Sequence, residues 1–251
     1  MTALARTKPF VLNDIHTDVW HAHALSQATL PVLASGDAAL DAQLPGGGWP
    51  VGALTEILQP PGVHSEWRLL LPALARSGLG PVVLVGPPHL PFAPALEAQG
   101  LAAHRLLWVK AAAPAARLWA CEQALRCAEV NAVLAWLPQA RSDQLRRLQM
   151  AAAEYSKLLF VMRPQAAQDD ASPAALRLYL QPQPQLQTQT AHSSSRLLPT
   201  PAGADSLQVR LLKRRGPPLS QPLQLQARAS RLTLLLASSQ AHALDCHTSR
   251  P

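Results

Sequence analysis

A short loop carries the residues of this sequence that come nearest to phosphate chemistry. It follows an apolar run at residues 53–58 and precedes a segment with an apolar helical face. The loop reads Gln59, Pro60, Pro61, Gly62, Val63, His64, Ser65 and Glu66. A strand, a glycine-containing loop and a helix in this order form the unit in which backbone N–H groups wrap phosphates, a Lys neutralises charge and a Ser or Thr hydroxyl holds Mg²⁺. The sequence therefore predicts the frame of a nucleotide-binding loop.

The side chains that this chemistry needs are missing from the frame. Aligned on the strand and the helix, His64 stands at the second glycine of the motif, Ser65 at the lysine and Glu66 at the Ser/Thr. A carboxylate at that place would repel phosphate. Hydrolysis also needs carboxylates at later strand ends to hold Mg²⁺ and to orient water, but those ends carry Trp136 and Pro88. We expect no enzymatic activity and no cofactor, while weak nucleotide binding stays open.

The elements that must position this loop alternate between short apolar runs and amphipathic segments. Strands are expected at residues 53–58, 82–85, 105–109, 132–136 and 158–162, and helices after the loop and at 92–99, 115–128 and 142–156. Such alternation is typical of a parallel sheet covered on both faces. Three later runs, residues 175–180, 207–213 and 223–227, alternate apolar with polar residues, which predicts antiparallel strands at the far edge of an α/β fold.

The last of these helices, residues 142–156, has a start signal and an apolar face. Ser142 is the expected N-cap, since a hydroxyl accepts a hydrogen bond from a free N–H of the first turn. The helical spacing predicts that Leu145, Leu148, Ala152 and Tyr155 are buried.

Composition shifts divide the 251 residues into three parts. Residues 1–32 are expected to form an N-terminal helical arm, residues 33–237 the core, and residues 238–251 a disordered tail. Residues 181–206 are rich in Pro, Gln and Ser and lack periodicity, which is typical of a mobile loop. A further β-like run lies at 231–237.

Charge and cysteine content restrict the classes of partner and site. Lys and Arg number 22 against 15 Asp and Glu, a net charge of +7, so nucleic acid or an acidic protein surface stays open as a partner. The densest basic cluster, Lys213, Arg214 and Arg215, could contact phosphates or an acidic partner, or could be a solvated strand end. Three cysteines without a C-x-x-C pair indicate neither a disulfide framework nor a zinc site. We expect no metal site, no signal peptide, no membrane association and a reduced, cytoplasmic setting.

Several short motifs resemble the opening of the ATPase core of the RecA recombinases. They lie at residues 35–36, 40–41, 46–47, 50–52 and 56–57, and the resemblance continues in order to about residue 227. Among RecA relatives with a broken P-loop, residues 52–58 (GALTEIL), 69–74 (LLLPAL) and 211–216 (LLKRRG) resemble the ImuA family of bacterial mutagenesis cassettes. Position by position, the phosphate lysine of RecA corresponds to Ser65, its Mg²⁺ aspartate to Trp136 and its water-activating glutamate to the region of Pro88.

The resemblance implies a RecA-like P-loop NTPase core that acts as a pseudo-ATPase. It also implies a non-catalytic accessory role in SOS-inducible, error-prone translesion DNA synthesis, part of the bacterial DNA damage response. The implied partners are an ImuB-like Y-family polymerase homologue, an error-prone polymerase III α-subunit and DNA. Two alternatives stay open: a divergent RecA-like ATPase that acts on single-stranded DNA through residues such as His64 and Glu66, and a cell-division inhibitor of the SulA type, also a degenerate RecA relative.

Overall fold

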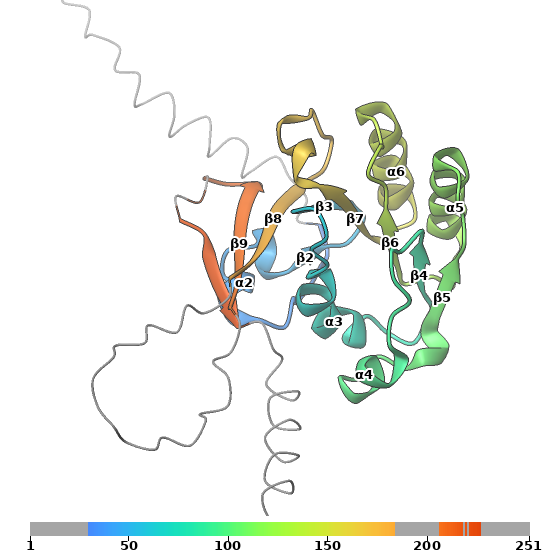
Figure 1. The fold of residues 1–251 in the computed structure, drawn as a ribbon, viewed down its shortest axis with the longest axis horizontal. Helices are drawn as coiled ribbons and strands as arrows, with labels where there is room; N and C mark the ends of the chain where they lie inside the picture. Colours follow the sequence, from blue (N-terminus) through green and yellow to red (C-terminus); the bar gives the residue numbers. More distant parts are fainter. Residues whose placement is uncertain (1–29, 184–205, 218, 220, 227–251) are drawn as a thin grey trace, which may run out of the picture. The chain divides into compact units, whose positions relative to one another are not determined.

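The structure is a computed structural model that describes residues 30–183, 206–217, 219 and 221–226. A mixed sheet of eight strands forms the centre of these residues (Figure 1). Its strands are β3 (Ala53–Gln59), β4 (Val82–Val85), β5 (Leu106–Val109), β6 (Ala132–Trp136), β7 (Leu158–Pro164), β8 (Leu176–Gln183), β9 (Ser206–Lys213) and β10 (Leu223–Gln226). The spatial order is β10-β9-β8-β3-β7-β6-β4-β5.

The six strands from β3 to β8 run parallel, and β9 and β10 are each joined to the sheet by antiparallel pairing. β3 pairs in parallel with both β7 and β8, and β4 pairs in parallel with β5 and β6. β9 is antiparallel to β8, and β10 is antiparallel to β9. The described residues therefore have the α/β architecture that the alternating pattern predicts, with antiparallel strands at the C-terminal edge.

Helices cover both faces of the sheet. Helices α3 (Glu66–Arg76), α4 (Ala93–Ala98) and the short α2 (Ala38–Asp41) pack on one face, while α5 (Pro114–Arg126) and α6 (Ser142–Glu154) pack on the other. Two short strands, β1 (Val32–Leu33) and β2 (Trp49–Pro50), form a separate antiparallel pair. The 3-10 turns are η1 (Pro45–Gly47), η2 (Ala103–Arg105) and η3 (Gln165–Asp169).

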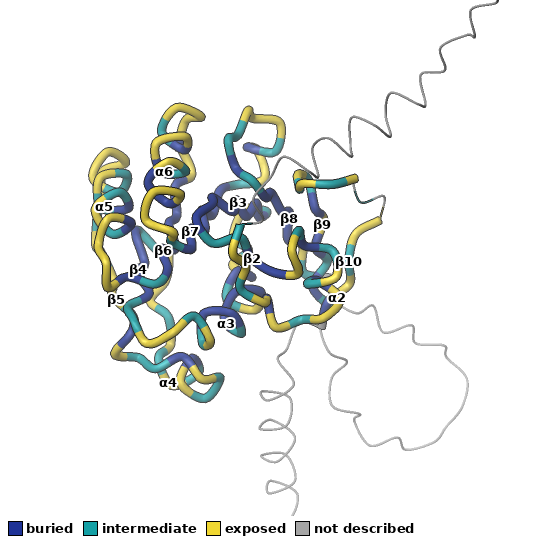
Figure 2. Tube along the Cα trace, turned by 180° about the vertical axis from the view of Figure 1, so that it is seen from behind, coloured by how far each residue is buried: buried dark blue, intermediate teal, exposed yellow. Residues whose placement is uncertain are grey.

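Alternating side chains of the strands feed two apolar cores. In β6, Leu134 and Trp136 pack in the core with α3, whereas Val133 and Ala135 pack against α5 and α6. This alternation follows from the two-residue repeat of a strand. Figure 2 shows the central strands β3, β4, β6 and β7 as mostly buried segments and the outer sides of α5 and α6 as exposed.

Most expected elements are confirmed, and two differ in part. The run at 175–180 was expected to be an antiparallel strand; it belongs to β8, which is antiparallel to β9 but pairs in parallel with β3 on its other side. Its polar-apolar alternation arises because Arg177 and Tyr179 are buried on the second face, not because that face is solvated. Residues 181–183, expected in a mobile loop, extend β8 and pair with β9.

The start of α6 also differs from the expectation. Arg141 is the N-cap, and its backbone N–H donates to the Gln144 side chain (2.9 Å), whereas Ser142 is the first helical residue. Tyr155 follows the helix and is exposed, so Ala151 takes its place on the buried face.

Several expectations fall on residues outside the described ranges. They concern residues 1–29 of the helical arm expected at 1–32, most of the loop at 181–206, the run at 231–237 and the tail at 238–251. Among the described helices, none is both long enough and apolar enough to cross a bilayer.

Candidate functional site

A hollow of about 490 Å³ lies at the carboxyl ends of the central parallel strands. Its walls are residues 59–64 after β3, 86–88 after β4 and 162–164 at the end of β7, together with Arg117, Trp136 and Pro138. Open α/β sheets hold their ligands in crevices at this edge. The loop, Pro88 and Trp136, which the sequence places at strand ends, thus line one hollow.

The side chain of Gln59 closes the loop from inside. Its Nε2 donates to Glu66 Oε2 (2.8 Å), and its Oε1 accepts a hydrogen bond from the Ser65 backbone N–H (2.7 Å). All three residues are buried. Ser65 and Glu66, the positions of the phosphate lysine and the magnesium-binding hydroxyl, thus belong to the floor beneath the hollow and do not line it.

The loop has few backbone amides left for a phosphate. Pro60 and Pro61 carry no N–H, the Val63 N–H donates to the Pro60 carbonyl (3.2 Å), and the Ser65 N–H is used by Gln59. Among residues 60–65, this leaves the amides of Gly62 and His64, whereas a phosphate cradle needs several converging donors.

Helix α3 begins with an acidic residue of its own. Glu66 lies in the first turn, where a carboxylate interacts favourably with the positive end of the helix dipole. The end of α3 that would face a phosphate in a working loop therefore already has a buried negative charge beside it.

Two histidines join the loop to the opposite wall. The rings of His64 and His89 meet edge to face, with centroids 4.8 Å apart. His64 Nδ1 also lies 4.0 Å from Glu66 Oε1. The ring contact holds the loop after β3 beside the segment that follows β4, so the two proline pairs, Pro60-Pro61 and Pro87-Pro88, belong to the same hollow.

Arg117 places a positive charge in the wall. Its Nε donates to the Ala111 carbonyl (2.8 Å) and its Nη1 to the Trp136 carbonyl (3.3 Å). The side chain lies directly against Gly86, where an added Cβ would come within 2.7 Å of Arg117 Nε. Among the described residues, no carboxylate pairs with this guanidinium. It is therefore a fixed cation whose charge is not compensated.

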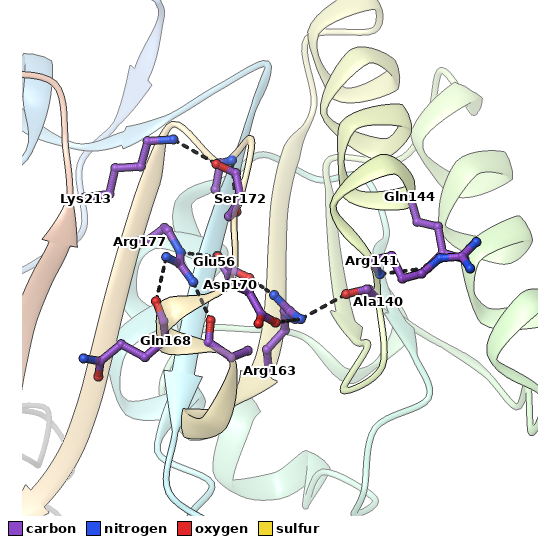
Figure 3. Close-up of polar contacts among 12 residues, drawn as sticks. Glu56, Ala140, Arg141, Gln144, Arg163, Gln168, Asp170, Ser172, Arg177 and Lys213 are labelled. Carbon is purple, nitrogen blue, oxygen red and sulfur yellow. Dashed lines mark hydrogen bonds and ion pairs between the residues drawn. The ribbon is translucent and has the colours of Figure 1, made fainter.

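A buried ionic network lies on the α5/α6 face of the sheet (Figure 3). Glu56 of β3 is fully buried between Arg163 of β7 and Arg177 of β8. Its Oε1 accepts from Arg163 Nη1 at 2.8 Å, and its Oε2 accepts from Arg177 Nε. Arg163 Nη2 also binds Asp170 Oδ2 (2.8 Å) and the Ala140 carbonyl (3.0 Å).

The same network holds the turn η3. Arg177 Nη1 and Nη2 donate to the carbonyls of Gln168 (3.0 Å) and Ala167 (2.8 Å). The network thereby ties three adjacent strands to the segment that covers them. Because Arg163 also lines the hollow, the network fixes one wall of the candidate site.

The basic cluster at 213–215 is divided among different contacts. Lys213 Nζ donates to the Ser172 carbonyl (3.0 Å), and Arg214 Nη1 donates to the Gln43 carbonyl (2.7 Å). Arg215 is exposed. Two of the three side chains thus contact neighbouring loops.

Comparison with known proteins gives one distant relative. The chain is 29% identical over 117 residues to the cell division inhibitor SulA of Edwardsiella piscicida. The match covers 45% of this chain and 61% of the SulA chain, so it spans less than two thirds of that relative. No family model matches the sequence.

Sequence reasoning missed Arg117 and the ionic network. Glu56 is the only charged residue in β3, and Arg177 is the only one in β8. One acidic residue in one apolar strand and one basic residue in another could have predicted a buried ion pair, because charged side chains are rarely buried alone. For Arg117 the signal is weaker, since nothing in the helix pattern shows that it faces the strand ends.

Proposed function

We propose that the chain is a non-catalytic accessory protein of SOS-inducible, error-prone translesion DNA synthesis. In this role it docks an ImuB-like Y-family polymerase homologue and an error-prone polymerase III α-subunit. The observation that carries the proposal is a RecA-like strand–loop–helix frame whose phosphate-binding groups are used internally or replaced. Gln59 binds both the Ser65 amide and the Glu66 carboxylate, so these groups are paired within the loop.

The three positions at which a recombinase handles charge support the same proposal. The lysine position, Ser65, is buried beneath the loop. The aspartate position is the indole of Trp136, and the glutamate region is Pro87-Pro88. A loop without its phosphate-binding lysine and a strand end without a carboxylate for Mg²⁺ lack two of the groups that stabilise phosphoryl transfer. What the frame retains is a stable scaffold, which suits docking.

The sheet supports the RecA-like part of the proposal. The resemblance predicts a mostly parallel sheet with antiparallel strands at its C-terminal edge, and β9 and β10 are such strands. The likeness to SulA supports a place in the SOS response, which is common to the accessory and the division-inhibitor readings.

The test is a pull-down with the full chain at micromolar concentration against two purified candidates, the Y-family-polymerase-like protein and the division tubulin. We expect a complex with the polymerase-like protein. Absence of that complex, with the chain shown to be folded, would refute the accessory role.

A second candidate function is inhibition of cell division, favoured by the 29% identity to SulA over 117 residues. It predicts binding to the division tubulin in the same pull-down and filamentous cells on overexpression. Cells of normal length at high expression would exclude it. We rank it second because the terminal LLKRRG and GALTEIL motifs resemble the accessory family.

A further inference from the structure

We propose that the hollow at the strand ends binds a short peptide segment of a partner protein that presents a carboxylate beside an apolar side chain. The inference rests on the proposed docking function and names the chemistry of the segment that docks. In this hollow a carboxylate would take the place that phosphate has in a nucleotide site, and different residues would bind it.

The charges that line the hollow favour the binding of one anionic group. Both hydrogen bonds of Arg117 go to backbone carbonyls, which are neutral, so its positive charge has no partner among the described residues. The other arginine in the wall, Arg163, is already paired with Glu56 and Asp170. A carboxylate placed against Arg117 would form a charge-assisted hydrogen bond, the stronger class of hydrogen bond.

The position of Arg117 is set before any ligand arrives. The backbone of Gly86 lies against the guanidinium, and the carbonyls of Ala111 and Trp136 hold two of its nitrogens. A cation that is already ordered loses little conformational entropy on binding. This arrangement suits recognition of a single carboxylate better than a flexible surface lysine would.

Much of the remaining lining is apolar, beside the polar side chains of Gln59, His64 and Arg163. Pro60, Pro61, Pro87 and Pro88 form two facing proline pairs, with Trp136 and Met162 between the strand ends. Prolines supply apolar surface and no N–H, so they cannot cradle a polyphosphate but can pack against a Leu or Phe side chain. The size, about 490 Å³, is in the range of sites for small ligands and side chains.

A second observation points to an acceptor. The indole of Trp136 lines the hollow and is 7% exposed, and its Nε1 has no hydrogen-bond partner in the described structure. Buried N–H groups in native proteins almost always have one. The indole therefore leaves one N–H donor at the lining without an acceptor among the described residues. The chain's net charge of +7 favours a partner with acidic segments.

The experiment follows the six Trp indole N–H resonances of the full chain by ¹H–¹⁵N NMR. The probes are a blocked peptide Gly-Leu-Glu-Phe-Gly, its Gln analogue, phenylacetate and pyrophosphate. A Trp136→Phe variant assigns the reporter resonance. We expect the Glu peptide to shift this resonance saturably, and the Gln analogue to bind about tenfold more weakly, as loss of a charge-assisted hydrogen bond predicts. This comparison needs no variant in the hollow.

Matched variants on one helix locate the charge. Arg117→Gln is expected to lower the affinity for the Glu peptide to the affinity of the natural chain for the Gln analogue. Arg126→Gln, at an exposed residue of the same helix paired with Glu122, is expected to leave binding unchanged. The other indole resonances report whether each variant keeps its fold.

Four results would overturn the inference: equal binding of the Glu and Gln peptides, unchanged binding by Arg117→Gln, binding of phenylacetate without the peptide, or displacement of the peptide by pyrophosphate. The last two would assign the hollow to a small molecule or to phosphate. Because no polymerase is present, failure here together with a positive pull-down would leave the proposed function intact and place its docking surface elsewhere. A negative pull-down with saturable peptide binding would keep the site and refute the partner.

Discussion

Among substitutions in the described core that keep the side chain nearly the same shape, Glu56→Gln should lower the free energy of unfolding most. Glu56 is fully buried and accepts hydrogen bonds from two guanidiniums. Glu56→Gln removes the negative charge and turns an N–H donor toward one of the arginines. Asp170 then remains as the one carboxylate beside two buried cations, and it contacts only Arg163. Breaking a buried ion pair from one side costs about 3–5 kcal/mol.

This cost is large against a typical total stability of about 5–15 kcal/mol. For a domain of this size it corresponds to a fall in Tm of roughly 6–20 °C, at about 2–4 °C for each kcal/mol. The assay is urea unfolding of the full chain, with the midpoint and slope compared between variants.

The matched control is Asp170→Asn. Asp170 binds the same Arg163, but its side chain is 55% exposed, so its replacement should cost less than about 1 kcal/mol. A loss below about 1 kcal/mol for Glu56→Gln, or a loss equal to that of Asp170→Asn, would show that the network is not the buried support that the geometry indicates.

Three further predictions concern the loop, a buried thiol and two glycines. Gln59→Ala removes two buried hydrogen bonds, so we expect a loss of about 1–3 kcal/mol in urea unfolding, and an unchanged midpoint would contradict the closed loop. Burial raises the pKa of Cys121 from 9.0 to about 12. The unfolded thiol ionises first, so stability contributed by the protonated thiol is complete below pH 9 and is lost as the pH rises toward 12. The stability of the natural chain should fall by about 1.4 kcal/mol relative to Cys121→Ser between pH 8 and 10, and a constant difference would refute the burial. Gly80→Ala drives a Cβ into the Glu129 carbonyl and should cost about 1–3 kcal/mol. Gly62→Ala meets open space and should cost about 1–2 kcal/mol, only the strain of its positive φ. Thermal unfolding measures both costs, and a cost below about 1 kcal/mol for Gly80→Ala would argue against the close contact.

A strand was predictable where Pro and Gly residues stand at the two ends of an apolar run. The strand β4, Val82–Val85, lies between Pro81 and Gly86, and the expected range agrees with the observed one. The convergence of Trp136 and Pro88 on one hollow also followed from the sequence, because parallel strands end at the same edge of a sheet.

The direction of β8 could not be predicted from its own residues. Alternating polar residues indicate a solvated face only when nothing covers that face, and here η3 covers Arg177. Because η3 lies outside the strand, the alternation of residues within β8 does not show that η3 covers this face.

The details of the site depend on loop and helix geometry that local patterns do not encode. The contact of Gln59 with Glu66 requires the chain to turn through Gly62 at φ +72°. The role of Arg117 depends on how α5 is rotated about its axis above Gly86. Both are consequences of packing between segments that lie apart in the sequence.

We propose that this chain docks a polymerase-like partner without nucleotide chemistry. The decisive experiment is a titration of the full chain with the Y-family-polymerase-like protein, with and without Mg²⁺-ATP, while phosphate release is recorded. We expect a complex at micromolar concentration whose Kd is the same in both conditions, and no phosphate release above that of buffer. A complex that forms only with ATP, phosphate release by the chain, or no complex at all would contradict it.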